Sequence, residues 1–141
     1  LGLSSYMYYG NWDLGFTMRA SIGNYAYNNV ASANGNQDNL YDLGTIRNAH
    51  ASILDTNFRN PQYWSDYYIQ DASFLKMDNI TLGYNFENIK NGDVRLRLYS
   101  TIQNVFTVTD YDGLDPEING GIDNNFYPRP QTVLFGFNVN F

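Results

Sequence analysis

Five acidic side chains crowd one segment of the chain that is rich in Gly and Asn. They are Asp110, Asp112, Asp115, Glu117 and Asp123. Carboxylate oxygens are the ligands that Ca²⁺ accepts in proteins. The spacing departs from the EF-hand pattern, because neither the third liganding position nor the terminal Glu of that motif aligns. We therefore expect no resident cofactor, with a calcium ion in this segment as the alternative.

Aromatic residues form a second group with recognisable chemistry. The chain holds 13 Tyr, 9 Phe and 2 Trp, and several of them stand among Asn, Asp and Gly in long connecting segments. Aromatic faces beside amides suit the capture of sugars or peptides, and rings also serve protein interfaces. The other interpretation is that these rings only pack the loops. The candidates for contact with a ligand or a covering protein are Trp64, Tyr67, Tyr111, Phe126 and Tyr127.

Side chains that could catalyse a reaction are sparse. His50 is the only His, Cys is absent, and neither a G-x-S-x-G elbow nor an H-E-x-x-H pair occurs. The net charge is −6, from 8 Lys plus Arg against 14 Asp plus Glu. Such a charge repels a phosphate backbone instead of releasing its counterions. The sequence therefore predicts a protein that has no catalytic residues, is not an enzyme and does not bind nucleic acid.

The alternation of apolar and polar residues predicts the elements that carry these side chains. From Trp12 the even-numbered residues are apolar and the odd-numbered ones are mostly polar or Gly. The same period of two recurs before Phe86, after Val94 and up to Phe141. This period indicates β-strands with one apolar and one polar face. We expect strands at about 1–9, 12–27, 73–86, 94–104 and 132–141, the first of them with faces that the sequence leaves unassigned.

The connections between these strands alternate in length. Residues 10–11 and 87–93 form short turns, whereas 28–71 and 105–131 are long loops. Antiparallel neighbours place successive connections at alternate ends of a sheet, so the long loops share one end. Outer-membrane barrels have this arrangement, with short periplasmic turns, long extracellular loops and an apolar face toward lipid. The sequence therefore predicts an all-β fold, namely about five strands of an antiparallel transmembrane β-barrel.

Two charged residues interrupt the alternation in the strand that ends near Phe86. Lys76 and Asp78 share the parity of Ile80, so a regular strand would point both charges at lipid. A position at the outer rim of the barrel would remove this conflict. A β-bulge near Met77 would also remove it, because one extra residue shifts the parity of the strand.

Three segments of the sequence are distinctive in their exact residues and not only in their alternation of apolar and polar positions. They are 71–86 (DASFLKMDNITLGYNF), 103–117 (QNVFTVTDYDGLDPE) and 126–130 (FYPRP), the last followed by the terminal strand. Together they resemble the C-terminal end of the SusC/RagA family of TonB-dependent outer-membrane transporters, with Lys76 where that family commonly has Arg. Five strands cannot close a plugged barrel, for which about 22 strands are typical. We therefore expect residues 1–141 to be the C-terminal portion of such a barrel.

The resemblance implies a multi-pass protein in a Gram-negative outer membrane of the Bacteroidota type. It implies import of a glycan oligomer or a peptide, driven by the proton-motive force. The implied partners are TonB acting through an N-terminal plug, a SusD-like surface lipoprotein, the barrel-assembly machinery and outer-membrane lipid. The alternatives are a passive outer-membrane porin, which lacks a plug, and a soluble secreted carbohydrate-binding β-sandwich, which would bury its apolar face in its own core.

Two further groups of residues follow from this interpretation. Phe141, with Phe137 and Val139 at alternate positions, resembles the C-terminal signal that outer-membrane proteins present to the barrel-assembly machinery, which could recognise an unpaired edge strand by β-augmentation. The same residues also suit a lipid-facing strand. Polar residues that could contact the plug or line the substrate path, or simply form a solvated wall, are Arg19, Arg95, Arg97, Tyr99 and Gln103.

Overall fold

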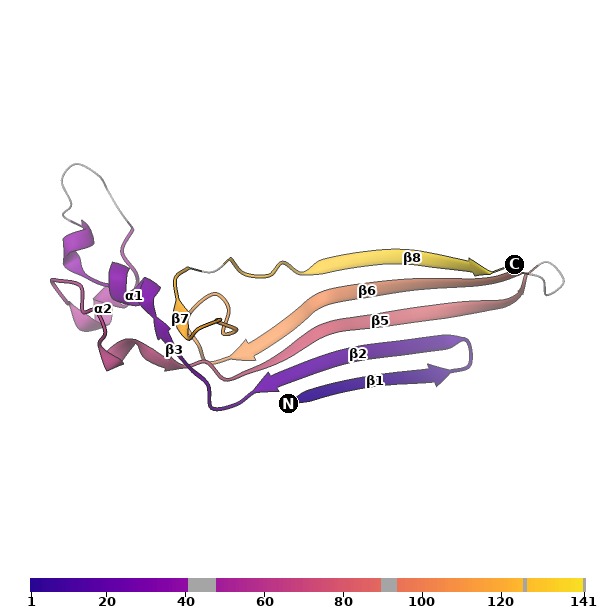
Figure 1. Cartoon of the computed structure of the whole chain (residues 1–141). Coiled ribbons are helices and arrows are strands. Elements are labelled where there is room, and N and C mark those ends of the chain that lie inside the picture. Colours follow the sequence, from indigo (N-terminus) through magenta and orange to yellow (C-terminus); the bar gives the residue numbers. More distant parts are fainter. Residues whose placement is uncertain (41–47, 90–93, 126, 141) are drawn as a thin grey trace. The chain divides into compact units, whose positions relative to one another are not determined.

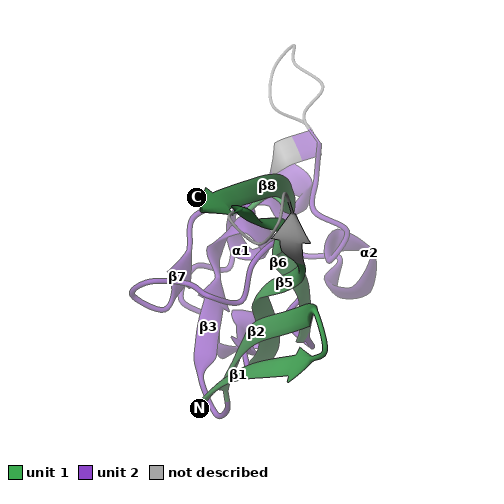
Figure 2. Ribbon diagram, turned by 90° about the vertical axis from the view of Figure 1, so that its right-hand side faces the viewer, with its two compact units in different colours: residues 1–21, 74–108, 129–141 green, residues 22–73, 109–128 purple. Residues whose placement is uncertain are grey.

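The computed structural model describes residues 1–40, 48–89, 94–125 and 127–140. The chain divides into two compact units (Figure 2). The strand unit comprises Leu1–Ser21, Phe74–Val108 and Arg129–Phe141. The loop unit comprises Ile22–Ser73 and Thr109–Pro128, which make up the long connections between strands.

The strand unit is a five-stranded sheet with the order β1-β2-β5-β6-β8 (Figure 1). Long strands that follow one another in the sequence are therefore neighbours in the sheet, which is a meander with β1 and β8 at its edges. The bounds of the strands are Gly2–Tyr9 for β1, Trp12–Ser21 for β2, Phe74–Ile89 for β5, Val94–Thr109 for β6 and Thr132–Asn140 for β8.

Three strands differ in length from the sequence-based expectation. β5 continues past residue 86 to Ile89, into the segment 87–93 that was expected to be a turn. The strand expected over 12–27 is divided, because β2 ends at Ser21 and a separate strand, β3, occupies Tyr25–Asn28. Gly23 lies between them with a φ of 78°, a left-handed backbone conformation that glycine adopts readily and that interrupts an extended chain. β6 continues past residue 104 to Thr109, so the second long loop begins later than expected.

The strand registers place apolar residues on one face of the sheet and polar residues on the other. Met7 of β1 is opposite Leu14 of β2, which is opposite Leu82 of β5. This pairing assigns the faces of β1, which the sequence left open. We call the side that carries these residues the apolar face and the opposite side the polar face.

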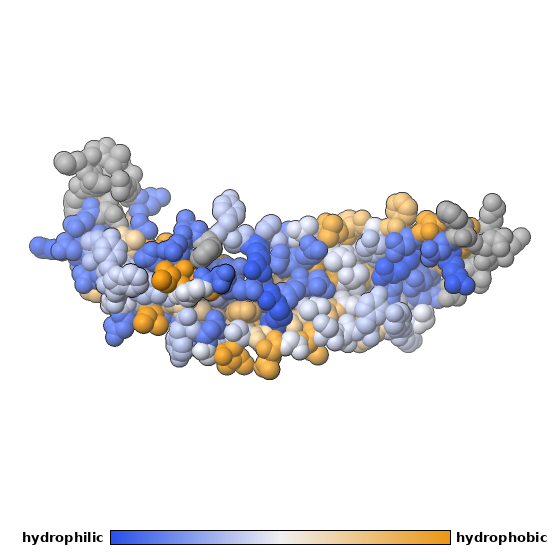
Figure 3. All heavy atoms as spheres, viewed as in Figure 1, coloured by the Kyte–Doolittle hydropathy of each residue, from blue (hydrophilic) through white to orange (hydrophobic). Residues whose placement is uncertain are grey.

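The apolar face is exposed instead of forming a core. Phe135 is 83% exposed and Phe137 is 70% exposed, and apolar residues reach the surface along the strands (Figure 3). Within the described residues, every buried hydrophobic side chain belongs to the loop unit, namely Ala26, Ala31, Tyr68, Ala72 and Tyr111. A β-sandwich would bury its apolar face against a second sheet, so the structure argues against that alternative.

A β-bulge resolves the conflict at Lys76 and Asp78. Thr17 of β2 is opposite Asn79, but the next residue, Met18, is opposite Met77. Asp78 is therefore the extra residue of the bulge. Beyond it, Lys76 stands opposite Arg19 and so joins the polar face. The structure thus confirms the predicted bulge near Met77.

The loop unit contains short helices and a small sheet. Its sheet has the order β4-β3-β7, in which β3 pairs with β4 antiparallel and with β7 parallel. Ala26, Ala72 and Tyr111 form its core, with Ile118 packed against them. In the described part of the chain, no helix has both the length and the hydropathy to cross a membrane. The remaining elements are α1 (Asn29–Asn34), η1 (Gln37–Leu40), α2 (Ile53–Thr56), η2 (Asp66–Tyr68), β4 (Ile69–Asp71) and β7 (Ile122–Asp123).

Candidate functional site: the polar face and the loop unit

Asp13 lies at the centre of a hydrogen-bonded cluster on the polar face. It is only 2% exposed. Arg97 donates from Nε to Asp13 Oδ2 over 2.9 Å and from Nη2 to Oδ1 over 2.5 Å. The hydroxyl of Tyr6 donates to Oδ1 over 2.9 Å, and Nδ2 of Asn85 donates to Oδ2 over 3.0 Å. These four residues, which we call the Asp13 cluster, tie together β1, β2, β5 and β6.

Two glycines let large polar side chains lie flat on this face. Gly83 is opposite Asp13, and a Cβ atom at Gly83 would collide with the carboxylate of Asp13 and lie 2.7 Å from Nη2 of Arg97. Gly136 is opposite Tyr99, and a Cβ atom there would collide with the Tyr99 ring. The side chains therefore run along the sheet surface, and the ion pair forms close to the backbone.

Replacing Gly83 with Ala is expected to displace the Asp13–Arg97 ion pair. The added methyl group overpacks a tightly filled position, which typically costs about 1–3 kcal/mol. Denaturant unfolding of the full-length protein that contains this segment measures the loss. The matched control is Gly2→Ala, because a Cβ at Gly2 meets no atom within 4 Å. Equal stability of the two variants would contradict the close packing of the ion pair.

All five residues predicted to contact a plug or line the substrate path lie on the polar face. They are spread along the length of the strands. Cζ of Arg97 lies 5.0 Å from the centroid of the Tyr99 ring, within the range of a cation–π contact. Arg19 instead pairs with the bulge residue, with Nη2 donating to Asp78 Oδ1 over 2.8 Å. The remaining two, Arg95 and Gln103, are opposite Asn140 and Thr132 of β8. Their function stays a prediction.

Sequence reasoning missed Tyr6, Asp13 and Asn85 as members of a polar cluster. A weak signal was present, because Asp13 is the one acidic residue among the polar positions of its strand. The residues of the cluster come together only once the registers of four strands are known. A period of two assigns a residue to a face but does not tell which residues of other strands stand beside it.

Trp64 and Tyr67, two of the predicted contact residues, display aromatic surface on the loop unit. Trp64 has a φ of 62°, a conformation that is a genuine outlier for a bulky residue. Its backbone N–H donates to the hydroxyl of Tyr27 over 2.8 Å, and its indole stacks on the Tyr27 ring at 5.7 Å. The indole is still 79% exposed. Tyr67 packs edge-on against Phe58 and Tyr68 and is 51% exposed.

The other predicted contact residues differ from these two. Tyr111 is 5% exposed, and its hydroxyl donates to Asp123 Oδ2 over 2.8 Å. Burial raises the pKa of Tyr111, and the hydrogen bond to the Asp123 carboxylate raises it further. Tyr111 therefore packs the loop, as in the alternative interpretation of these aromatics. Tyr127 is 95% exposed, and Phe126 lies outside the described residues.

The acidic segment uses its carboxylates to organise the loop. Besides the bond from Tyr111 to Asp123, Gln70 donates to Asp112 over 2.9 Å and the backbone N–H of Glu117 donates to Asp115 over 3.0 Å. A cavity of about 260 Å³ is lined in part by His50, Asp112 and Asp123. In the residues that the structure describes, no three His, Asp or Glu side chains are grouped so that they could hold a metal ion. Calcium binding by these residues and by Asp110 stays a prediction.

The raised pKa of Tyr111 predicts a loosening of the loop unit at alkaline pH. The neutral phenol stabilises the fold fully below the ordinary tyrosine pKa of about 10, and this contribution is lost as the pH rises through the raised value. Hydrogen exchange at residues 109–123, corrected for intrinsic rates, should report the loss. Tyr111→Phe should be less protected at neutral pH but should lose less protection on alkalinisation. The same pH response in both proteins would contradict the role of this hydroxyl.

The residues of the predicted assembly signal lie at one edge of the sheet. Phe137 is opposite Leu98 and Val139 is opposite Leu96, so both are on the apolar face of β8. β8 pairs with β6 and has no second partner strand among the residues that the structure describes. Phe141 itself lies outside the described residues. The recognition of this edge by an assembly machine stays a prediction.

A meander of long strands, with one exposed apolar face and one polar face held by an ion pair, defines a segment of an outer-membrane-type β-barrel wall. No family model matches the chain. The chain is 42% identical over its whole length to the TonB-dependent receptor SusC of Bacteroides thetaiotaomicron, of which it covers 15%. It is 29% identical over its whole length to the TonB-dependent receptor P3 of Formosa agariphila, of which it covers 16%.

Solved structures share the fold. The structure of the RagAB peptide transporter matches 93% of this chain with a TM-score of 0.76 at 22% identity, and the chain covers 16% of that structure's chain. The chain belongs to the SusC/RagA-like TonB-dependent receptors, and it spans about 15% of the length of the curated relatives that it matches. These relatives are receptors and transporters, which confirms the prediction that the chain is not an enzyme.

Proposed function

We propose that the chain is a wall segment of an outer-membrane transporter, with its apolar face against lipid and its polar face toward the lumen. The observation that carries the proposal is the contrast between the two faces. The apolar face leaves Phe135 and Phe137 largely exposed, whereas the polar face buries Asp13 in an ion pair with Arg97. Lipid accepts apolar side chains and requires that strands satisfy their backbone groups in a closed barrel.

Aromatic residues near the short turns support this orientation. Trp12, Tyr84 and Phe86 all belong to the apolar face, at the ends of β2 and β5 that lie beside short connections. Their rings contact one another, with centroids 4.7 Å apart for Trp12–Tyr84 and for Tyr84–Phe86. Barrels carry such aromatic girdles at the membrane–water interface. This end of the strands would accordingly mark the periplasmic interface.

The complete transporter would import a glycan oligomer or a peptide with energy from the proton-motive force. TonB would act on an N-terminal plug inside the barrel, and the polar face would form part of the fixed wall around it. The Asp13 cluster holds four strands together by side-chain hydrogen bonds, which suits a wall that must resist the movement of a plug. Arg95 and Arg97, which belong to the short-turn end of β6, would contact the plug.

The loop unit belongs to the extracellular connections in this proposal. Its exposed aromatics, Trp64, Tyr67 and Tyr127, would contact the substrate or a SusD-like lipoprotein that covers the barrel. The barrel-assembly machinery would recognise the edge strand β8, with Phe137 and Val139, before the barrel closes. The alternative is a passive porin. It is disfavoured because the relatives of this chain are TonB-dependent receptors.

An uptake experiment on the full-length transporter tests the proposal. Cells that express it are supplied with labelled oligosaccharides and peptides, with and without TonB and with and without a protonophore. Import should require both TonB and the proton-motive force. Import at the same rate without TonB would contradict the proposal and would indicate a passive porin.

A further inference from the structure

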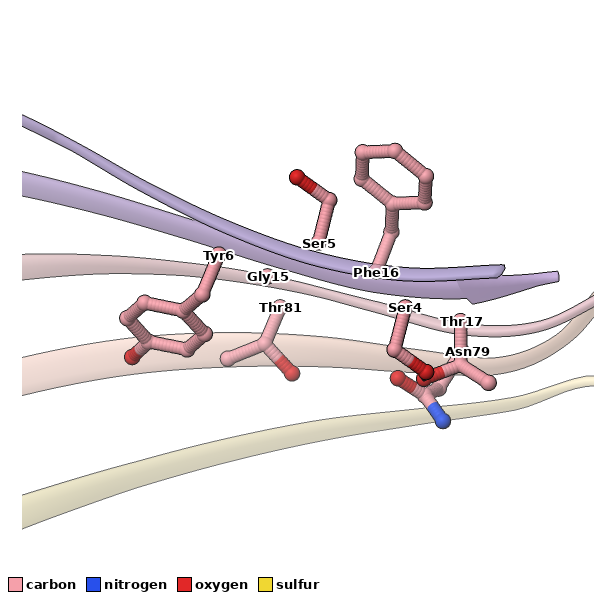
Figure 4. A pocket seen from close by; sticks show the side chains of 8 residues that line it. All are labelled: Ser4, Ser5, Tyr6, Gly15, Phe16, Thr17, Asn79 and Thr81. Atoms are coloured by element: carbon pink, nitrogen blue, oxygen red, sulfur yellow. The ribbon is translucent and has the colours of Figure 1, made fainter. Parts of the chain in front are cut away.

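A hollow of about 310 Å³ opens over the middle of β1, β2 and β5, within the strand unit. Figure 4 shows that Tyr6, Ser4, Thr17, Asn79 and Thr81 point to one side of the strands, whereas Ser5 and Phe16 point to the other. The first group belongs to the polar face by its strand register. The hollow therefore opens toward the side that the proposed function assigns to the lumen.

A glycine and a fixed aromatic ring shape this hollow. Gly15 is opposite Tyr6, and a Cβ atom at Gly15 would lie 2.7 Å from Cδ2 of the Tyr6 ring. The ring thus lies over the glycine instead of standing up from the sheet. The bond from its hydroxyl to Asp13 holds it there, and Tyr6 remains 53% exposed. One side of the hollow is therefore a preorganised aromatic surface.

The other side chains around the hollow are uncharged and can both donate and accept hydrogen bonds. Oγ of Ser4 lies 3.3 Å from Oγ1 of Thr17, and Oγ1 of Thr81 lies 2.8 Å from Oγ1 of Thr101. Asn79 adds an amide. Hydroxyls and amides offer donors and acceptors together, unlike carboxylates or ammonium groups. The lining is thus suited to a ligand that is itself rich in hydroxyl groups.

Charged groups flank the hollow along the strands but are engaged in ion pairs. On the short-turn side, Asp13 is paired with Arg97. On the long-loop side, Asp78 is paired with Arg19. An ionic ligand in the hollow would lose hydration without meeting an opposite charge in its lining, which is unfavourable. The surroundings therefore favour a neutral ligand over an ionic one.

We propose that this hollow is a subsite for one neutral sugar ring of the transported molecule. Tyr6 supplies an aromatic face against the ring, and Thr17, Asn79 and Thr81 exchange hydrogen bonds with its hydroxyls. Ligand sites commonly combine apolar surface with a few placed polar groups. This inference rests on the proposed function, since it takes the polar face to line the transport path. It narrows the substrate from a glycan or a peptide to a glycan with uncharged units.

The test uses the full-length transporter in its cells and the double variant Thr17→Val/Asn79→Leu, which removes hydrogen-bonding groups at nearly constant volume. The probes are neutral hexose oligosaccharides, an acidic uronate oligosaccharide and a peptide of similar length. The KM for uptake of the neutral oligosaccharides should rise about tenfold, because two hydrogen bonds of ordinary strength are lost. The control is Ser100→Val in β6, which is opposite Phe135 on the apolar face, and it should leave this KM unchanged.

The outcomes separate the subsite from the proposed function. An unchanged KM in the double variant, or an equal rise in Ser100→Val at equal surface expression, overturns the subsite. Wild-type uptake of the peptide or the uronate in preference to neutral oligosaccharides also overturns it. Uptake of neutral oligosaccharides that does not need TonB contradicts the proposed function, whereas wild-type failure to take up any probe overturns both.

Discussion

Replacing Asp13 with Ala in the full-length protein is expected to lower the free energy of unfolding of the barrel by about 3–5 kcal/mol. The side chain is 2% exposed and accepts hydrogen bonds from Arg97, Tyr6 and Asn85. Its removal leaves the Arg97 guanidinium without its counter-charge on the sheet surface. The hydroxyl of Tyr6 and the amide of Asn85 also lose their acceptor. Denaturant unfolding followed by tryptophan fluorescence measures the loss.

Two controls separate the ion pair from a general effect of mutation. The double variant Asp13→Ala/Arg97→Met removes the uncompensated charge together with its partner, so it should recover much of the stability. Asp55→Ala removes an exposed carboxylate of the loop unit and should change stability by no more than about 0.5 kcal/mol. If Asp13→Ala were as stable as Asp55→Ala, the Asp13 cluster could not be what ties the four strands together.

The variant Phe137→Lys is expected to destabilise the barrel by about 2–4 kcal/mol, the cost of a Lys that faces lipid near the bilayer midplane. Phe137 belongs to the apolar face of β8 and is 70% exposed, so the residues that the structure describes cover little of its side chain and would not shelter an ammonium group. Folding into lipid vesicles, followed by denaturant titration, measures the cost.

The matched control is Leu134→Lys on the same strand. Leu134 is also apolar, but its partner is Thr101, so it belongs to the polar face. A Lys there would meet water in the lumen and should cost less than about 1 kcal/mol. Similar costs at residues 134 and 137 would show that the two faces of β8 meet the same environment.

The sequence was sufficient to predict the five strands of the sheet, apart from where some of them end, and the two faces of every strand but β1. The alternation that begins at Trp12 and recurs up to Phe141 is a local property, and each residue carries its own evidence. The one interruption of this alternation was also informative. Lys76 and Asp78 occupy positions that a regular strand would turn toward the apolar face, so they required a bulge or a position at the rim of the barrel. The structure places the bulge at Asp78.

The features that depend on contacts between distant segments could not be predicted. Gly83 and Gly136 look like weak points of a strand, and their purpose emerges only when Asp13 and Tyr99 are seen to lie against them. The same holds for the aromatics of the loops. Trp64 and Tyr111 stand in similar sequence surroundings, yet one is 79% exposed and the other 5%, because the irregular fold of the loop unit decides which ring is buried.

The central claim is that the apolar face of the sheet meets lipid and the polar face meets an aqueous lumen. This segment contains no Cys, so single Cys substitutions at each residue from 133 to 138 meet no other thiol within it. They are made in the full-length protein after replacement of any Cys outside the segment. In lipid vesicles, a fluorophore attached to the Cys at odd-numbered positions should be quenched by nitroxide-labelled lipid, and the free Cys at even-numbered positions should react with a water-soluble maleimide. An absence of alternation, or odd positions shielded from lipid as in a protein core, would contradict the account.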